Sequence, residues 1–243
     1  MQLKHYYYYF KEAISPEICE KIVNLGKSNI INSAVTYGDN HKQAKPKALS
    51  QNDKTLEELI KDGIDVENTY VRDSDVSWIN DSWLYDLIIP YVKTANESAG
   101  WLYDFDYAED FQFTIYNKNG FYGWHSDGMS DHNAVYKRYI PGISPTKKNG
   151  EKEQGYVDSE KMIGKIRKLS VTINLNNPND YEGGNLKFDF GPHATVKRYH
   201  LCEEIRPQGS IVIFPSYIFH QVTPITKGTR YSLVLWCLGK PFK

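Results

Sequence analysis

Apolar and polar residues alternate in short segments through the second half of the chain. In Leu169–Leu175 every odd-numbered position is aliphatic, while Ser170, Thr172 and Asn174 share the opposite face. Alternation of this kind is typical of a β-strand that buries one face. Turn residues separate such segments, and the whole pattern favours an eight-stranded double-sheet jelly roll. The predicted strands are Phe111–Tyr116, Gly123–Asp127, Leu169–Leu175, Leu186–Phe190, Thr195–Tyr199, Ser210–Phe214, His220–Pro224 and Arg230–Cys237.

A helical pattern occurs near the start of the chain. Ser15–Glu17 has the residue types of a helix N-terminus, and an apolar stripe follows it to about Gly26. The segment Tyr37–Gly63 is polar and is interrupted by Gly, Asn and Pro, which predicts surface structure. Within it, Leu56–Ile60 indicates a short helix.

A strand and a second helix are predicted before the alternating segments begin. The strand is Val71–Ile79. The helix begins at Asp81 or Ser82, both of which are good N-cap residues, and its apolar stripe continues through Val92. Pro90 lies inside this helix and predicts a kink, because proline lacks the amide hydrogen that the helix needs.

These elements predict a mainly β (α+β) fold in which flanking helices support a jelly-roll core. We expect a single domain over residues 1–243, with residues 1–110 as support and residues 111–239 as the core. The polar insertion Gly128–Lys165 is too long for an ordinary hairpin loop. We interpret it as a lid over a site or as a disordered flap.

Composition narrows the class of protein. The formal net charge is -1, from 29 basic and 30 acidic residues, so the chain has no general attraction for nucleic acid or an anionic membrane. Cys19, Cys202 and Cys237 form no CxxC pair, which argues against a disulfide framework and for buried thiols in a reducing compartment. The N-terminus lacks the pattern of a signal peptide, and no apolar run approaches ~20 residues. We therefore expect a soluble, cytoplasmic protein.

One short motif carries metal-binding chemistry. His125 and Asp127 are two residues apart in an extended segment, so their side chains project from the same face. His220 follows a predicted strand and turn that would return the chain to the mouth of the barrel. Two histidines and one carboxylate leave several metal positions open, which is typical of non-haem Fe(II) oxygenases, whereas zinc favours a more closed site. Taken alone, His-x-Asp also fits a solvated surface turn.

Arg230 begins the last predicted strand, ten residues after His220. Its planar guanidinium binds carboxylates bidentately and keeps its charge, so it suits the distal carboxylate of an oxoacid whose other end chelates iron. The polar faces of neighbouring strands supply candidate hydrogen-bond partners for this cosubstrate. They are Tyr116, Thr114, Asn174 and Ser232. The alternative is that these faces meet water, as one side of an antiparallel sheet often does, with Arg230 an exposed cation.

The order of these motifs along the chain resembles the prolyl 4-hydroxylase-like branch of the Fe(II)/2-oxoglutarate-dependent oxygenases, and the PKHD-type hydroxylases most of all. The resemblance covers Phe111–Gly239 and extends weakly to Arg72–Trp78 and the first helix. After His-x-Asp, the segments that carry it are Asn174–Asn176, Glu182–Leu186, Gly209–Phe214, His220–Pro224 and Gly228–Leu233.

The resemblance implies an enzyme that uses Fe(II), 2-oxoglutarate and O2, with ascorbate as a further candidate cofactor. It would hydroxylate a C–H bond and release succinate and CO2, with His125, Asp127, His220 and Arg230 as its catalytic residues. The family suggests a prolyl or other residue of a peptide or protein as substrate, and a free amino acid or small molecule is the alternative. Nucleic-acid demethylases usually carry a second arginine where this chain has Trp236, so a nucleic-acid substrate is disfavoured.

Other interpretations of these features stay open. The chain could be a metal-binding jelly-roll recognition module without turnover, although the intact set of metal and cosubstrate residues argues against this. Tyr122 and Trp124 flank the metal motif and are interpreted either as a substrate wall or as core packing. His132 is close enough in sequence to Asp127 to reach the site. The sequence does not predict the oligomeric state.

Overall fold

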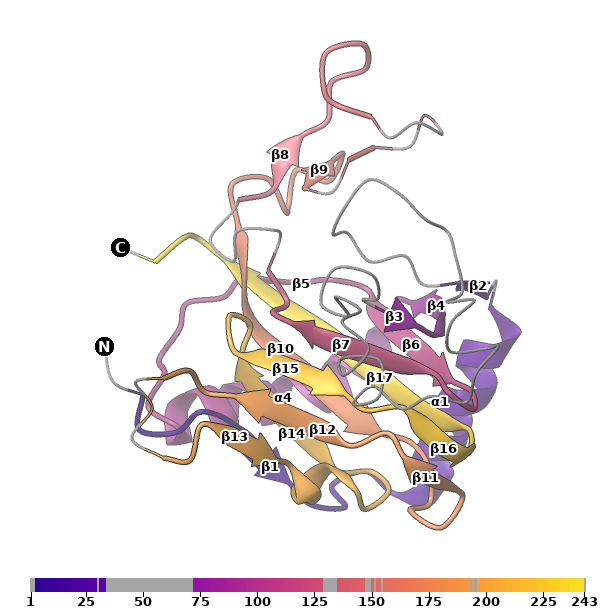
Figure 1. The fold of residues 1–243 in the computed structure, drawn as a ribbon. Coiled ribbons are helices and arrows are strands. Elements are labelled where there is room, and N and C mark those ends of the chain that lie inside the picture. The colour runs from indigo at the N-terminus through magenta and orange to yellow at the C-terminus, as the bar shows by residue number, and fades with distance from the viewer. Residues whose placement is uncertain are drawn as a thin grey trace, which may run out of the picture.

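The computed structural model describes residues 3–29, 31–33, 72–128, 135–146, 150, 152–153, 155–192, 194 and 196–242. In this part of the chain two antiparallel sheets lie face to face, and two α-helices pack on the larger sheet (Figure 1). The predicted mainly β fold with flanking helices is confirmed. The short helix expected at Leu56–Ile60 lies outside the described residues, as do Val71, His132 and Thr195.

The larger sheet has eight strands, and β17 and β10 form its centre. Its order is β1 (Tyr8–Phe10), β14 (Ile211–Pro215), β10 (Ile166–Asn174), β17 (Arg230–Gly239), β6 (Phe111–Tyr116), β4 (Asp75–Ile79) and β2 (Asn32–Ser33), with β5 (Tyr107–Ala108) also paired to β17. The smaller sheet has the order β13 (Tyr199–Leu201), β12 (Leu186–Asp189), β15 (Phe219–Val222), β7 (Phe121–His125) and β3 (Arg72–Asp73). A two-stranded sheet, β11 (Tyr181–Gly183) with β16 (Ile225–Gly228), completes one end, and a 3-10 turn, η1 (Glu203–Ile205), precedes β14.

The two longer predicted helices are present and cover the outer face of the larger sheet. Helix α1 is Pro16–Ser28, and the Ser15 hydroxyl accepts a hydrogen bond from the Ile18 amide at its start. Helix α4 is Ser82–Ser98 and continues through Pro90, so it is longer than the sequence predicted. The apolar stripes of both helices pack against the aliphatic face of the sheet and form the main core.

The inner faces of the two sheets enclose a second, smaller core at one end. Phe188 on β12 and Phe214 on β14 meet there with their ring centroids 5.1 Å apart. Towards the other end the inner faces become polar and line a cavity. The even-numbered residues of β17 from Arg230 to Trp236 face this cavity, as the alternation predicts, while Leu233 and Leu235 face the helices.

Several predicted strands have different bounds. The segment expected as one strand at Val71–Ile79 is two, because β3 joins the smaller sheet and β4 the larger, and the chain crosses between the sheets at the buried Ser74. Strand β7 ends at His125, two residues before its predicted end. The strand predicted at Thr195–Tyr199 instead begins at Tyr199, where pairing with β12 starts.

The shortest strands were not predicted from the sequence. Strands of two to four residues, such as β1, β2, β5, β11 and β16, are too short to show a period of two. None of the helices that the structure describes is long and apolar enough to cross a membrane.

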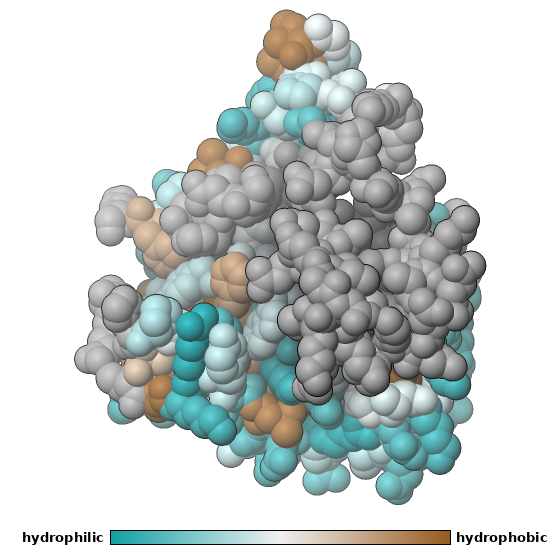
Figure 2. Space-filling model, in the orientation of Figure 1, coloured by the Kyte–Doolittle hydropathy of each residue, from teal (hydrophilic) through white to brown (hydrophobic). Residues whose placement is uncertain are grey.

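The insertion after Asp127 contains the parallel pair β8 (Lys137–Arg138) and β9 (Tyr156–Val157) and stands away from the two sheets (Figure 1). The Tyr136 amide donates to the Lys165 carbonyl at its base. Ile143, between the two strands, is 79 % exposed. Figure 2 shows hydrophobic residues at this tip, whereas on the body of the molecule they form separate spots among hydrophilic ones.

Candidate active site

Residues from both sheets line the polar cavity. His125, Asp127 and His220 come from the smaller sheet and the bend after it, and Arg230 comes from β17 of the larger sheet. All four were identified from the sequence, and the fold brings them to the same cavity. They are far apart in the chain, so it is the pairing of β7 with β15 and the stacking of the sheets that bring them together.

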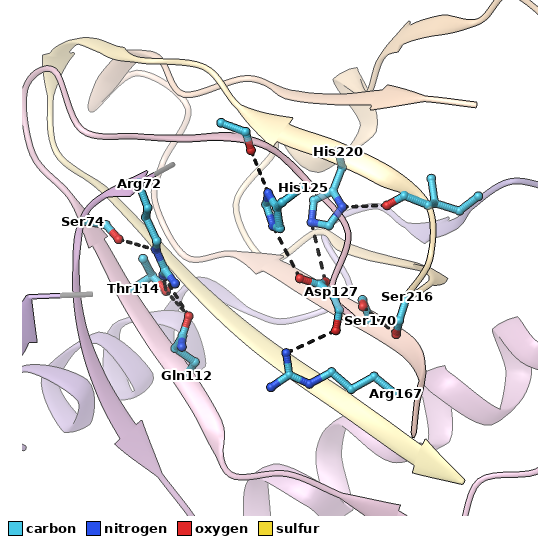
Figure 3. Close-up of polar contacts among 12 residues, drawn as sticks. Arg72, Ser74, Gln112, Thr114, His125, Asp127, Arg167, Ser170, Ser216 and His220 are labelled. Carbon is cyan, nitrogen blue, oxygen red and sulfur yellow. Dashed lines mark hydrogen bonds and ion pairs between the residues drawn. The ribbon is translucent and has the colours of Figure 1, made fainter. Parts of the chain in front are cut away.

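The side chains of His125, Asp127 and His220 converge on one point. One ligand atom from each lies within 4.8 Å of the others. The Nε2 atoms of His125 and His220 are 3.5 Å and 3.6 Å from the two carboxylate oxygens of Asp127. Figure 3 shows both imidazole rings directed at this carboxylate. His125 ends β7 opposite His220 on β15, and Asp127 follows in the bend.

Local hydrogen bonds fix the orientation of each imidazole ring. The Nδ1 atom of His125 lies 2.8 Å from the Gly123 carbonyl oxygen, and that of His220 lies 2.9 Å from the Ile218 carbonyl oxygen. A carbonyl oxygen only accepts, so each Nδ1 carries the proton and donates it. This tautomer leaves the Nε2 lone pair free for a metal ion, as is usual for metal-binding histidines.

The surroundings also set the protonation states of this group. Burial and the neighbouring His125 lower the pKa of His220 to about 4, so it is neutral near pH 7. Burial would raise the pKa of Asp127, but the adjacent histidines and Arg167 outweigh it and hold that pKa well below its usual range. A neutral imidazole and an ionised carboxylate are the states that bind a divalent metal.

The backbone of Asp127 is held on both sides. Its amide donates to the Ser216 carbonyl over 2.8 Å, and its carbonyl accepts from Nη1 of Arg167 over 3.3 Å. Arg167 in turn forms two parallel hydrogen bonds with the Glu109 carboxylate, of 2.6 Å and 2.7 Å, and its guanidinium stacks on the Trp236 ring at 3.8 Å. These contacts restrain the position of the carboxylate.

Arg230 is a buried cation with no ion pair among the described residues. Its side chain is 2 % exposed, and its guanidinium lies 5.5 Å from the centre of the Tyr116 ring. Gly184 lies close behind it, because a Cβ there would come 3.0 Å from Cδ of Arg230 and 2.4 Å from the Ile225 side chain. The cavity therefore presents an unneutralised arginine that is suited to an anion.

The four predicted cosubstrate partners occupy different positions. Tyr116 and Ser232 line the cavity. Thr114 is buried beside it, where its hydroxyl lies 3.4 Å from Nη2 of Arg72. The Asn174 amide instead donates to the Asn176 and Arg206 carbonyls, and Asn174 is not among the residues that line the cavity.

The two aromatic residues beside the metal motif point in opposite directions. The Tyr122 ring lines the cavity and stacks on His125, with ring centroids 3.4 Å apart. Trp124 is 38 % exposed and faces Tyr199 on the outer surface of the smaller sheet. The substrate-wall interpretation therefore fits Tyr122 and does not fit Trp124.

No sequence motif assigned a role to Arg72, Glu109 or Arg167 in the site. Arg72 lines the cavity from β3, and the other two support Asp127. Their contacts join strands that are 40 to 58 residues apart in the chain, so no local motif marks them. Trp236 also lines the cavity, and its buried Nε1 has no hydrogen-bond partner in the part of the chain that the structure describes.

Known proteins share part of this sequence. A PKHD-type hydroxylase of Xylella fastidiosa (strain 9a5c) is 30 % identical over 126 residues, which is 51 % of this chain and 42 % of that protein. A PKHD-type hydroxylase of Picosynechococcus sp. is 32 % identical over 105 residues, 43 % of this chain and 41 % of the relative. The chain therefore aligns with less than half the length of these relatives.

Solved structures share the fold at low sequence identity. A viral collagen prolyl hydroxylase from Paramecium Bursaria Chlorella virus-1, in a 2OG complex, aligns with a TM-score of 0.53 at 16 % identity, over 97 % of each chain. A Pseudomonas putida prolyl-4-hydroxylase aligns with a TM-score of 0.51 at 14 % identity, over 96 % of this chain and 92 % of that one.

Membership of a family is shown by a match to a family model. The family model of the 2OG-Fe(II) oxygenase superfamily matches residues 111–238, which is more than half of the chain. This segment runs from β6 to β17 and includes every residue of the converging histidine and aspartate group, as well as Arg230. The chain therefore belongs to the 2OG-Fe(II) oxygenase superfamily.

Proposed function

We propose that this chain is an Fe(II)- and 2-oxoglutarate-dependent hydroxylase. In this proposal His125, Asp127 and His220 hold the metal ion, and Arg230 binds the distal carboxylate of 2-oxoglutarate. Membership of the superfamily implies Fe(II), 2-oxoglutarate and O2. When bound, iron and the cosubstrate supply the oxidising chemistry that converts a C–H bond to an alcohol and releases succinate and CO2.

The donor atoms fit the metal. Two imidazole nitrogens and one carboxylate, all within 4.8 Å of one another, form the two-histidine, one-carboxylate set that suits Fe(II) and leaves further coordination positions open. The single observation that carries the proposal is that the buried guanidinium of Arg230, which has no ion pair among the described residues, shares the cavity with this set. A dicarboxylic oxoacid would fit this arrangement, with Arg230 holding one of its carboxylates.

The other residues of the cavity orient and shield the ligands. Tyr116 and Ser232 face the cavity beside Arg230, and we propose that their hydroxyls donate to the cosubstrate. The stacked Tyr122 ring covers one side of His125 and excludes water from it. Glu109 and Arg167 keep Asp127 in position from behind.

For the substrate, we propose a prolyl or other residue of a peptide or protein. A structural neighbour supports this choice, since it is a prolyl hydroxylase from Trichoplax adhaerens in complex with a hypoxia inducible factor oxygen degradation domain peptide fragment. A free amino acid or small molecule is the second candidate, and the two arginines that line the cavity favour an acidic one. Ascorbate as a reductant stays a prediction.

Anaerobic titration tests the core of the proposal. Adding 2-oxoglutarate to the Fe(II)-loaded protein is expected to produce a weak visible charge-transfer band, because the oxoacid chelates the iron. Admitting air is then expected to release succinate. Folded protein that gives no band would exclude the proposed site, and a band without succinate would favour a binding module that performs no turnover.

A further inference from the structure

A second arginine lines the same cavity. Arg72 comes from β3 at the edge of the smaller sheet, and its half-buried guanidinium faces β6 of the larger sheet. Its Nε donates to the Ser74 hydroxyl over 2.7 Å, and its Nη2 lies 2.9 Å from Oε1 of Gln112 and 3.4 Å from Oγ1 of Thr114. Figure 3 shows Arg72 beside Gln112 and Thr114, apart from the metal-binding group.

These contacts orient Arg72 without neutralising its charge. All three acceptors are uncharged, and no carboxylate in the described ranges forms an ion pair with Arg72. Its Nη1 group, with two N–H donors, has no acceptor among these residues. A half-buried cation that is held rigidly and has spare donors is suited to binding an anion.

Aromatic stacking fixes this cation relative to the metal site. The guanidinium of Arg72 lies 4.6 Å from the centre of the Tyr122 ring. The same Tyr122 ring stacks on His125, with the ring centroids 3.4 Å apart and an angle of 9° between the planes. Arg72 is therefore one aromatic ring away from a proposed metal ligand.

The cosubstrate does not account for this second cation. In the proposed function one carboxylate of 2-oxoglutarate chelates iron and the other pairs with Arg230. Arg72 is oriented by Gln112 and Thr114 of β6, whereas Arg230 is opposite Tyr116, two to four residues further along the same strand. Two to four residues along a strand correspond to roughly 7 to 13 Å. Arg72 thus faces a different part of the cavity.

We propose that Arg72 binds a carboxylate of the primary substrate, so that this chain hydroxylates an acid. The inference rests on the proposed function and narrows it. The carboxylate can belong to a free amino acid or to an acidic residue of a peptide, since both present the same planar pair of oxygens to the guanidinium. An isosteric amide keeps the shape and loses the charge, and it is bound more weakly.

The test compares acids with their amides on the Fe(II)- and 2-oxoglutarate-loaded wild-type protein. The probes are the common L-amino acids with their primary amides, and capped peptides that differ by Glu against Gln or Asp against Asn. Two readouts are followed: the shift of the visible band under anaerobic conditions, and the stimulation of succinate release in air. We expect at least one acid to bind roughly 10 to 100 times more tightly than its amide.

Variants of Arg72 assign the preference to this residue. Arg72→Gln is expected to abolish the difference between acid and amide and to leave the 2-oxoglutarate titration midpoint within about twofold of wild type. Arg72→Lys keeps the charge and should recover part of the preference. The arm that shows the preference, free amino acid or peptide, identifies the source of the carboxylate.

Two results would overturn the inference. One is that no acid in the panel is preferred over its amide by the wild-type protein, which requires no variant to fold. The other is that Arg72→Gln weakens 2-oxoglutarate binding as strongly as Arg230→Gln does, which would mean that Arg72 binds the cosubstrate. Both differ from failure of the proposed function, in which the wild-type protein gives no visible band with Fe(II) and 2-oxoglutarate.

Discussion

Glu109 and Arg167 form a bidentate ion pair directly behind Asp127, with hydrogen bonds of 2.6 Å and 2.7 Å. Breaking one partner of a buried pair leaves an uncompensated charge, which typically costs about 3–5 kcal/mol. We therefore expect Glu109→Gln to lower the free energy of unfolding by this amount and to weaken iron binding, because Arg167 also holds the Asp127 backbone. Urea unfolding and iron analysis measure the two effects.

The exposed pair of Asp189 and Arg198 provides a matched control. It has the same bidentate geometry, but Arg198 is on the surface. Asp189→Asn should change stability little, since solvent screens exposed ion pairs. If Glu109→Gln and Asp189→Asn lower the free energy of unfolding by similar amounts, the buried pair does not stabilise the fold more than the surface pair.

Replacing Arg230 separates cosubstrate binding from metal binding. Arg230→Gln removes the charge-assisted bidentate contact, so 2-oxoglutarate affinity should fall roughly 10- to 100-fold while iron affinity stays near the wild-type value. Arg230→Lys retains charge without the planar fork and should give an intermediate loss. Anaerobic titrations measure both affinities. Equal loss of iron and 2-oxoglutarate would show that Arg230 has a structural role.

The converging group should be required for metal retention. His125→Ala and Asp127→Ala each remove one of the three proposed ligands, so the purified proteins should keep little iron after dialysis. Trp124→Phe alters the residue directly before His125, whose side chain faces outwards, and serves as the control. Metal analysis that finds wild-type iron content in Asp127→Ala would place the metal elsewhere.

Gly26 should be essential for the packing of α1 on the larger sheet. A Cβ at this position would come 2.3 Å from the Phe113 ring, so Gly26→Ala forces the helix or the ring to move. Overpacking of this kind costs about 1–3 kcal/mol, which denaturant unfolding can resolve. Asn24→Ala on the exposed side of the same helix should be neutral or slightly stabilising. If Gly26→Ala does not lower the free energy of unfolding, the Phe113 ring moves aside without cost.

The cysteines should be unreactive in the native protein. Burial raises the pKa of Cys19 to about 11 and that of Cys237 to about 12, and burial also raises the pKa of Cys202. At pH 8 the native thiols stay protonated, whereas unfolded thiols, with a pKa near 8.5, form reactive thiolate. Because the folded pKa is raised, native stability should fall as the pH increases above about 8.5. Ellman's reagent, with and without urea, measures the first effect.

The sequence predicts the parts of this molecule that local chemistry determines. Alternation revealed the central strands, and His-x-Asp with a later histidine and Arg230 marked residues that do meet in one cavity. Arg72 was not recognised as a cavity residue, because its position depends on a break at Ser74 that transfers the chain from one sheet to the other. The local sequence of Val71–Ile79 favours one continuous strand over two separate ones.

Long-range register explains the remaining differences. Glu109 and Arg167 are 58 residues apart, and only the pairing of β5, β17 and β10 brings them together. The division at residue 110 into support and core stays a prediction. Strands β2 and β4, which precede this point, belong to the same sheet as β6, which follows it.

The Glu109 carboxylate also accepts a 3.0 Å hydrogen bond from the Tyr136 hydroxyl, at the start of the described part of the insertion. This hydrogen bond connects the insertion to the Glu109 carboxylate, which also pairs with Arg167. Replacing residues 135–165 with a compact turn would remove the Tyr136 hydroxyl from Glu109. It would also expose the Trp236 ring, which packs in the same cluster as Tyr136. A shortened chain would need to retain a donor at that position, because Glu109 holds Arg167 and Arg167 holds the Asp127 backbone.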